Sequence, residues 1–366
     1  MKTLHVQIGK RSYPIHIGSG LHGRLPDLLR EIGWSRRRPL MLVTDDQVGA
    51  LYGKDVKRDL TDHGFQVGYL TIPAGESSKR LSLLEEMAGD CIRAGLDRTG
   101  AILALGGGVV GDLAGFLAAS YMRGIPFVQL PTTLLAHDSS VGGKVGVNHP
   151  LGKNMIGAFH QPSMVVFDVE TLHTLPEREV ASGYAEVVKH ALIRDVGFVR
   201  WLERQVEDLK RLDPESVSEA IWKGCAVKAE VVSQDEKESG LRAILNYGHT
   251  IGHALEAAAG YGSLTHGEAV ALGMVGEAML AEESGLCPPV SERIARLLSA
   301  FGLPTRLTLE LTDEELLERM RRDKKVRKGK LTFALPRGIG RVDMVDGLEE
   351  SVIRRALNRL RGGEAG

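Results

Sequence analysis

Short apolar runs alternate with segments of helical spacing in the first half of the chain. Each run is bounded by Gly, Pro or Asp, and apolar residues recur every three or four positions between the runs, as in 78–95. Short runs with such boundaries are typical of buried strands. The runs lie in 39–46, 64–73, 100–108, 125–133 and 163–169. This alternation predicts an α/β domain in which helices cover a largely parallel sheet.

The second half of the chain is predicted to be mainly α-helical. Apolar residues recur at helical spacing over 177–212 and through most of the remaining chain. Only 329–336, "GKLTFALP", is typical of a late strand. The predicted domains are therefore 1–178 and 179–366, and active sites commonly lie in the cleft between such domains.

Composition and charge exclude several classes of protein. The 366 residues suffice for two cores, and a net charge of −1 does not favour nucleic acid as a partner. Residues 1–20 alternate like strands rather than forming a signal peptide, and no apolar run is long enough to span a bilayer. The three scattered cysteines indicate neither a disulfide framework nor a thiolate metal site. We therefore expect a cytoplasmic protein with no nucleic-acid or membrane partner.

A glycine-rich turn indicates nucleotide binding. Gly106, Gly108 and Gly111 stand in G-x-G-x-x-G order between a predicted strand and a predicted helix, where free N–H groups attract a pyrophosphate. The usual ribose-binding acid is missing from the end of the next strand, in 127–133. Either Asp45 holds the ribose instead, or the turn serves only for packing. We favour a dinucleotide-binding domain of non-standard arrangement.

Two further segments concentrate polar side chains. Residues 137–162 combine lysines and amides with many glycines, which predicts a surface loop suited to a polyhydroxylated or phosphorylated ligand. A second set follows helical steps, which predicts one polar stripe along a single helix. The stripe comprises Glu238, Arg242, Asn246, His249 and His253.

The histidines of this stripe are candidate metal ligands. His249 and His253 have the i, i+4 spacing of two ligands on one helix. Spacing alone leaves open whether His253 or His266 completes the site. Glu186, which shares a predicted helix face with Lys189, is the best-placed carboxylate. A set of two histidines and one glutamate leaves a coordination position open to substrate.

With these segments in view, the chain resembles the 3-dehydroquinate synthases, of the sugar-phosphate cyclase superfamily. The resemblance extends from "VTDD" to "GKLTFALP", and its most specific segments are 106–136, 147–162 and 241–256. It implies an N-terminal dinucleotide-binding α/β domain, a mainly α-helical C-terminal domain and a homodimer. It also implies a metal site of Glu186, His249 and His266.

The resemblance assigns the remaining site residues as well. It implies that His253 transfers protons and binds substrate, with Glu238 a further acid/base candidate. The implied substrate contacts are Arg123, Asp138, Lys144, Asn154, Lys189, Lys228, Arg242 and Asn246, with Lys324 or Lys325 as a possible addition. The implied NAD contacts are Asp45, Ala74, Gly75, Glu76, Ser77, Ser78, Lys79, Gly108, Val109, Val110, Gly111, Asp112, Thr132, Thr133, Lys144, Lys153, Thr171, Leu172, His173 and Thr174.

The implied reaction belongs to the shikimate pathway of aromatic amino-acid biosynthesis. NAD+ and a divalent metal, Zn2+ or Co2+, convert 3-deoxy-D-arabino-heptulosonate 7-phosphate to 3-dehydroquinate and phosphate. Oxidation acidifies a C–H bond, phosphate is eliminated, the hydride returns, and an aldol step closes the carbocycle. Rival interpretations are a sister cyclase with another sugar phosphate, a metal-dependent polyol dehydrogenase, and a non-catalytic ligand-binding relative.

The chain departs from the family pattern at one place. Only His137 separates Ala136 from Asp138, where the family has two residues, and Val145 replaces a threonine. One missing residue removes about 3.3–3.6 Å of extended reach. The glycines before Lys144 are able to absorb this change, so we predict that Lys144 still faces the metal site. Asp138 has no such glycines before it, and its side-chain direction is the one that the deletion affects most.

Overall fold

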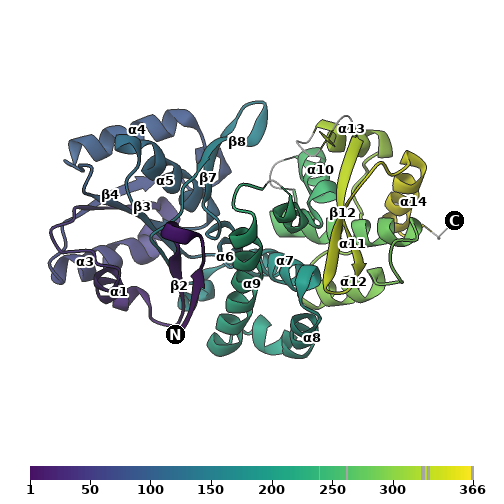
Figure 1. Cartoon of the computed structure of the whole chain (residues 1–366), viewed down its shortest axis with the longest axis horizontal. Coiled ribbons are helices and arrows are strands. Elements are labelled where there is room, and N and C mark those ends of the chain that lie inside the picture. The colour runs from purple at the N-terminus through teal and green to yellow at the C-terminus, as the bar shows by residue number, and fades with distance from the viewer. Residues whose placement is uncertain (239, 261–262, 323–325, 328–329, 364–366) are drawn as a thin grey trace. The chain divides into compact units, whose positions relative to one another are not determined.

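The chain packs as two compact units. The structure is a computed structural model that describes residues 1–238, 240–260, 263–322, 326–327 and 330–363 (Figure 1). Met1–Leu175 with Val217–Lys237 forms the first unit, and Pro176–Ser216 with Glu238–Gly366 forms the second. The boundary expected between residues 178 and 179 stays a prediction, and it did not include the return of 217–237 to the first unit. Lys324 and Lys325 lie outside the described residues.

The first unit is built on a seven-stranded sheet of order β1-β2-β9-β6-β5-β3-β4. All neighbouring strands are parallel except β1 and β2, which are antiparallel. The strands are β1 (Lys2–Val6), β2 (Tyr13–Gly18), β3 (Leu40–Asp45), β4 (Val67–Ile72), β5 (Ala101–Gly106), β6 (Phe127–Pro131) and β9 (Met164–Asp168). Every strand predicted from an apolar run is confirmed.

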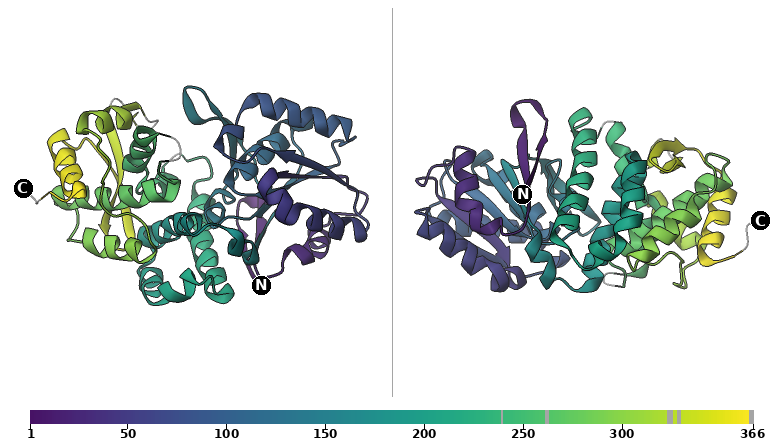
Figure 2. Two further views of the ribbon diagram at one scale, coloured as in Figure 1. Left: turned by 180° about the vertical axis from the view of Figure 1, so that it is seen from behind. Right: turned by 90° about the horizontal axis from the view of Figure 1, so that it is seen from below.

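Helices cover both faces of this sheet. On one face Met41 and Val43 pack with α4 and α5, while on the other Leu40 and Leu42 pack with α1 and α3. The two helical layers are seen above and below the strands in Figure 1 and again from behind in Figure 2. Burial on both faces explains why these strands read as continuous apolar runs. The helices are α1 (Leu25–Glu31), α2 (Asp46–Val48), α3 (Lys54–Asp62), α4 (Leu81–Arg93), α5 (Gly108–Ser120), α6 (Ala136–Ser139) and α9 (Pro214–Gln234), with short turns η1 (Gly9–Arg11), η2 (His22–Arg24), η3 (Gly49–Gly53), η4 (Glu76–Ser78), η5 (Tyr121–Arg123) and η6 (Val169–Thr174).

The surface loop predicted over 137–162 is wrong for most of its length. Strands β7 (Lys144–His149) and β8 (Gly152–Phe159) form an antiparallel hairpin instead. Val145 and Val147 are buried in the core cluster that includes α5. The high content of glycine and polar residues conceals this strand, because only alternate side chains of β7 enter the core.

Close contact between the two hairpin strands requires a glycine at position 157. A Cβ atom there would lie 2.2 Å from the carbonyl oxygen of Val145. We expect Gly157→Ala to lower the free energy of unfolding by about 1–3 kcal/mol, because backbone must move to accept the methyl group. Gly152→Ala is the matched control, since its Cβ would meet only the flexible Met155 side chain. Chemical denaturation gives the unfolding midpoint of each variant, and equal midpoints for Gly157→Ala and Gly152→Ala would contradict the expectation.

The second unit is mainly helical, as predicted, but contains more strand than expected. One late strand was predicted, and the described residues form a three-stranded sheet of order β10-β11-β12. Its strands are β10 (Val326–Arg327), β11 (Lys330–Gly338) and β12 (Arg341–Asp346). The helices are α7 (Glu177–Arg194), α8 (Val196–Lys210), η7 (Leu241–Asn246), α10 (His249–Ala259), α11 (His266–Glu283), α12 (Ser291–Ala300), α13 (Asp313–Arg322) and α14 (Glu350–Arg361). Across the described part of the chain, no helix combines the length and apolar character needed to cross a membrane.

Helix α11 is the central element of the second unit. Its buried residues occur all around its axis and are mostly Ala, Gly, Val and Leu. A helix that is apolar on every side must be enclosed by other elements. Here α7, α10, α12, α14 and β11 pack around it. The first residue of α11 is His266, so the helix places one candidate ligand directly.

Candidate metal centre and flanking polar sites

Glu186 lies in the middle of α7, on a part of the helix that is buried on every side. Its side chain is 1% exposed, and that of Lys189 one turn later is 2% exposed. The Lys189 ammonium pairs with Glu186 Oε2. A buried carboxylate is costly unless opposite charges compensate it. The second oxygen, Oε1, faces two histidines.

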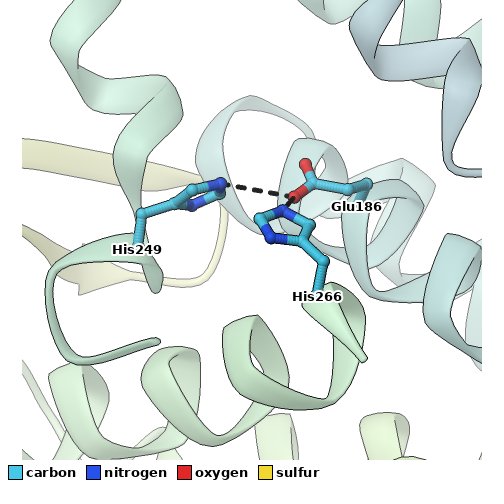
Figure 3. A group of neighbouring side chains, drawn as sticks. All are labelled: Glu186, His249 and His266. Atoms are coloured by element: carbon cyan, nitrogen blue, oxygen red, sulfur yellow. Dashed lines mark ion pairs between the residues drawn. The ribbon is translucent and has the colours of Figure 1, made fainter. Parts of the chain in front are cut away.

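His249 and His266 bring their Nε2 atoms to the same oxygen of Glu186 (Figure 3). Nε2 of His249 lies 3.4 Å from Oε1, and Nε2 of His266 lies 3.3 Å from it. These distances exceed the roughly 2.7–2.9 Å of an ionic hydrogen bond. They match the separation of about 3.3 Å between two atoms bound at about 2.0–2.1 Å to one tetrahedral metal. The three residues therefore fit a divalent cation.

Local sequence fixes where both ligand helices begin. Thr265 and Glu268 form a capping box, so α11 starts at His266. η7 ends at Asn246, and Gly248, with φ +81°, lets α10 start at His249. Glu238, at the other end of the stripe, also has positive φ, at +58°. The continuous helical stripe predicted from Glu238 to His253 is therefore wrong, although His249 and His253 do share α10.

The remaining ring nitrogens are held by acceptors. His249 Nδ1 lies 3.2 Å from the carbonyl oxygen of Tyr247, and His266 Nδ1 lies 3.5 Å from Glu256 Oε2. A carbonyl only accepts, so Nδ1 of His249 carries the proton and Nε2 offers its lone pair toward Glu186. Such second contacts orient metal-binding histidines. Glu256 was not predicted from the sequence, yet it lies three residues after His253 on the same helix, a spacing that could have revealed it.

The pKa values of the two candidate ligand histidines are shifted in opposite directions. Burial, together with the charge of Lys189, holds the pKa of His249 well below its usual value. Burial acts in the same direction on His266, but the carboxylates of Glu186 and Glu256 outweigh it and raise the pKa of His266 to about 9. The carboxylates around His266 thus create a negative potential that favours positive charge, and a bound metal ion would displace the proton of this histidine.

Of the other predicted site residues in the second unit, His253 lies beside this triad. The ring of His253 is 5.2 Å from that of His249 and 6.1 Å from that of His266, measured between centroids. Arg242 is fully buried. Asn246 Nδ2 donates to Glu238 Oε1 over 3.2 Å. The second unit thus brings His253 next to the predicted metal ligands and pairs Glu238 with Asn246.

In the first unit, Asp138 contacts Lys228 despite the missing residue before it. Lys228 Nζ lies 2.9 Å from Asp138 Oδ2 and donates to the Asp138 carbonyl oxygen over 2.6 Å. The buried Cys225, one turn earlier on α9, donates to the carbonyl oxygen of His137 over 3.5 Å. Two predicted substrate contacts are thereby paired. Lys144 is exposed at the start of β7, and its orientation toward the metal ligands stays a prediction.

Breaking this pair is expected to destabilise the protein. The side chains of Lys228 and Asp138 are only 10% and 22% exposed, so Lys228→Met leaves a carboxylate that is mostly shielded from water. We expect a loss of about 1–3 kcal/mol in the free energy of unfolding. The control is Lys223→Met on the same helix, which removes a more exposed pair with Glu219 and should cost less than about 1 kcal/mol. Urea denaturation compares them, and equal losses would count against a structural role for the pair.

Predicted NAD and substrate residues form one hydrogen-bonded network. Lys79 Nζ donates to Asp112 Oδ2 over 2.7 Å and to Asn154 Oδ1 over 2.6 Å. Asn148 donates to Glu76 Oε1 over 2.7 Å and accepts the N–H of Asn154 over 2.8 Å. Lys79 is buried, but the charges of Asp112 and Glu76 outweigh that burial and raise its pKa. The network fixes the positive φ of Asn154, at +53°.

The glycine turn has the predicted strand-to-helix form, between β5 and α5. Packing accounts for two of its glycines, since a Cβ at Gly106 would lie 2.6 Å from Val110 and one at Gly111 would lie 2.7 Å from Gln129. Asp45 caps α2 by accepting the N–H groups of Gln47 and Val48. Packing alone is therefore able to explain the glycine pattern, and support for nucleotide binding has to come from the other predicted NAD positions.

The other predicted NAD positions surround the carboxyl edge of the sheet. Thr132 follows β6, and its buried hydroxyl has no hydrogen-bond partner among the described residues. Gly75 has φ +101° ahead of η4, and the Ser78 hydroxyl donates to the Pro73 carbonyl over 2.6 Å. Thr174 bonds Tyr52 through their hydroxyls at 2.7 Å. Ligands of open parallel sheets bind at this edge.

Comparisons with known proteins decide the family. Residues 69–182 match the family described as 3-dehydroquinate synthase N-terminal, and residues 183–326 match 3-dehydroquinate synthase C-terminal. The 3-dehydroquinate synthase of Desulforamulus reducens is 50% identical over 98% of this chain and 100% of its own length. That of Symbiobacterium thermophilum is 49% identical over 97% and 100%. The chain belongs to the 3-dehydroquinate synthase family. It is accordingly an enzyme of the shikimate pathway, and the predicted family is confirmed.

Solved structures agree with this 3-dehydroquinate synthase fold. A 2-deoxy-scyllo-inosose synthase complexed with carbaglucose-6-phosphate, NAD+ and Co2+ has a TM-score of 0.87 and 27% identity, covering 99% of this chain and 100% of its own. ValA, a 2-epi-5-epi-valiolone synthase from Streptomyces hygroscopicus with NAD+ and Zn2+ bound, has a TM-score of 0.88 and 29% identity, covering 97% and 98%. The predicted fold class, an α/β domain followed by a mainly helical one, is confirmed.

Proposed function

We propose that the chain converts 3-deoxy-D-arabino-heptulosonate 7-phosphate to 3-dehydroquinate and phosphate, with NAD+ as a recycled cofactor and one Zn2+ or Co2+ ion. The main support for the proposal is that Nε2 of His249 and Nε2 of His266 both lie near Oε1 of Glu186, at the distances expected between ligand atoms of one metal ion. Membership of the family supports the substrate. Two related cyclases with bound NAD+ and Co2+ or Zn2+ support the cofactors.

The proposed chemistry divides between bound groups and side chains. A divalent ion held by Glu186, His249 and His266 would supply Lewis acidity, and NAD+ would supply a hydride acceptor and donor. Lys189, buried beside Glu186, offers its ammonium to anionic groups of the substrate. His253 lies next to both ligand histidines, where its imidazole is able to accept and return a proton.

The remaining proposed contacts recognise the charges of the substrate. Arg242 on η7 offers a planar fork of donors for a carboxylate or phosphate. In the first unit, Asn154 is held in place by Lys79, and Asp138 by Lys228. Arg123, with φ +68°, Lys144 and Asn246 complete the proposed substrate set. The homodimer implied by the family resemblance and the cytoplasmic location expected from the composition remain proposals as well.

A substrate comparison tests the proposal. Phosphate release should be fast with the heptulosonate phosphate and slow with a sugar phosphate that lacks the carboxylate, because a charged donor left unpaired in a desolvated site is costly. Detection of 3-dehydroquinate in stoichiometric amount with phosphate identifies the product. Preference for the sugar phosphate without a carboxylate would instead indicate a sister cyclase.

A further inference from the structure

Glu277 is a buried acid in the middle of α11 that the proposed mechanism does not use. It is 0% exposed and stands on a helix whose other buried residues are almost all small or apolar. Burying a carboxylate costs several kcal/mol unless strong donors surround it. Its position therefore requires a specific set of partners.

Those partners are backbone N–H groups at the start of α10. Glu277 Oε2 accepts the N–H of Gly248 over 2.7 Å, and Oε1 accepts those of Thr250 at 3.0 Å and Ile251 at 3.2 Å. The first N–H groups of a helix have no partner within the helix, and a side chain at the N-cap usually satisfies them. Here the N-cap is Gly248, which has no side chain. Glu277 takes over the capping role from a different helix, and its charge suits the positive helix end.

The turn formed by Tyr247 and Gly248, directly before His249, contacts α11 at two further points. The Tyr247 hydroxyl donates to the carbonyl oxygen of Met274 over 2.8 Å. A Cβ on Gly273 would lie 1.8 Å from the carbonyl oxygen of Gly248, so only glycine permits this approach. The backbone carbonyl oxygen of Tyr247 also accepts a hydrogen bond from Nδ1 of His249. The orientation of His249 thus depends on how the turn is fixed to α11.

We infer that Glu277 is a positioning residue for the proposed metal centre. It holds the N-terminus of α10 and thereby aims Nε2 of His249 at Glu186. Since α11 begins with His266, this one helix sets both ligand histidines, one directly and the other through Glu277. The inference rests on the proposed metal site and extends it to a residue that contacts neither the ion nor the substrate.

The experiment compares Glu277 with a matched carboxylate on the same helix. Glu282 Oε1 accepts the N–H groups of Val290 and Ser291, both at 2.7 Å, at the start of α12. Helix α12 carries none of the proposed ligands. The variants Glu277→Ala, Glu277→Gln and Glu282→Ala are purified and stripped of metal. Zinc affinity is then measured by competition with a chromogenic chelator, and the absorption spectrum of each Co2+-loaded variant is recorded.

We expect Glu277→Ala to weaken zinc binding about 10–100-fold and to change the Co2+ spectrum. Glu277→Gln keeps the shape and one acceptor oxygen, so its loss should be smaller. Glu282→Ala should lower the unfolding midpoint while leaving zinc affinity and the Co2+ spectrum as in the wild type.

Wild-type affinity and spectrum in Glu277→Ala would overturn the inference, as would equal losses of affinity in the Glu277 and Glu282 variants. If Glu277→Ala does not fold, Glu277→Gln decides by the same criteria. A wild-type protein that binds no stoichiometric metal would instead overturn the proposed function.

Discussion

Replacing His249 by alanine is expected to remove both the bound metal and the activity. The substitution deletes one of two nitrogen ligands and leaves Glu186 and His266 to hold the ion. Lewis-acid assistance is worth several kcal/mol, so kcat/KM should fall on the order of 10³-fold or more. Metal analysis after dialysis and a phosphate-release assay measure the two losses.

His253→Ala is the matched control, one turn later on the same helix. It should keep stoichiometric metal, because its ring lies beside the triad without being part of it. Activity should still fall about 10²–10⁴-fold if His253 transfers a proton. Retention of stoichiometric zinc by His249→Ala, or loss of metal in His253→Ala, would show that the roles of the two histidines are wrongly assigned.

Complete removal of NAD is expected to stop turnover, and a small fraction of one equivalent should restore many turnovers. The proposed reaction oxidises and later reduces the same substrate molecule, so the cofactor ends each cycle as it began. Phosphate should therefore accumulate with no lasting growth of the NADH absorbance.

The alternative outcome is consumption of one NAD per product. That result would indicate a dehydrogenase. The assay should include the Asp112→Asn variant, which weakens the pairing of Lys79 in the proposed NAD site. A higher NAD concentration should be needed for half-maximal rate in that variant.

The central strands and the candidate ligands were predictable because each depends on local pattern. Parallel strands that are buried on both faces appear as uninterrupted apolar runs, as 101–106 does. Glu186 stands between apolar residues on α7, and His249 was singled out by its i, i+4 spacing with His253. Hairpin β7–β8 was missed because one face only is buried, and many of its residues are glycine or polar.

Other features depend on contacts between distant parts of the chain. The break at Gly248 is stabilised by Glu277, which lies 29 residues later. Helical spacing extends through such a break without any visible sign, so the stripe appeared continuous. The capping role of Glu277 has no local pattern at all, because its partners are backbone groups. Sequence spacing and the family resemblance therefore located the candidate ligands but not the elements that orient them.

The interleaving of the two units bears on how the protein is made. The first unit lacks 217–237 until that segment has been synthesised, and 176–216, with α7 and α8, emerges before it. Glu219, the partner of Lys2, and Glu236, the partner of Arg11, thus leave the ribosome long after the N-terminal residues with which they pair. The first unit therefore cannot fold completely before the second begins to emerge, as an N-terminal domain usually does. For the same reason no single proteolytic cut releases either unit whole, so a fragment that ends at residue 175 would lack the lysine that pairs with Asp138.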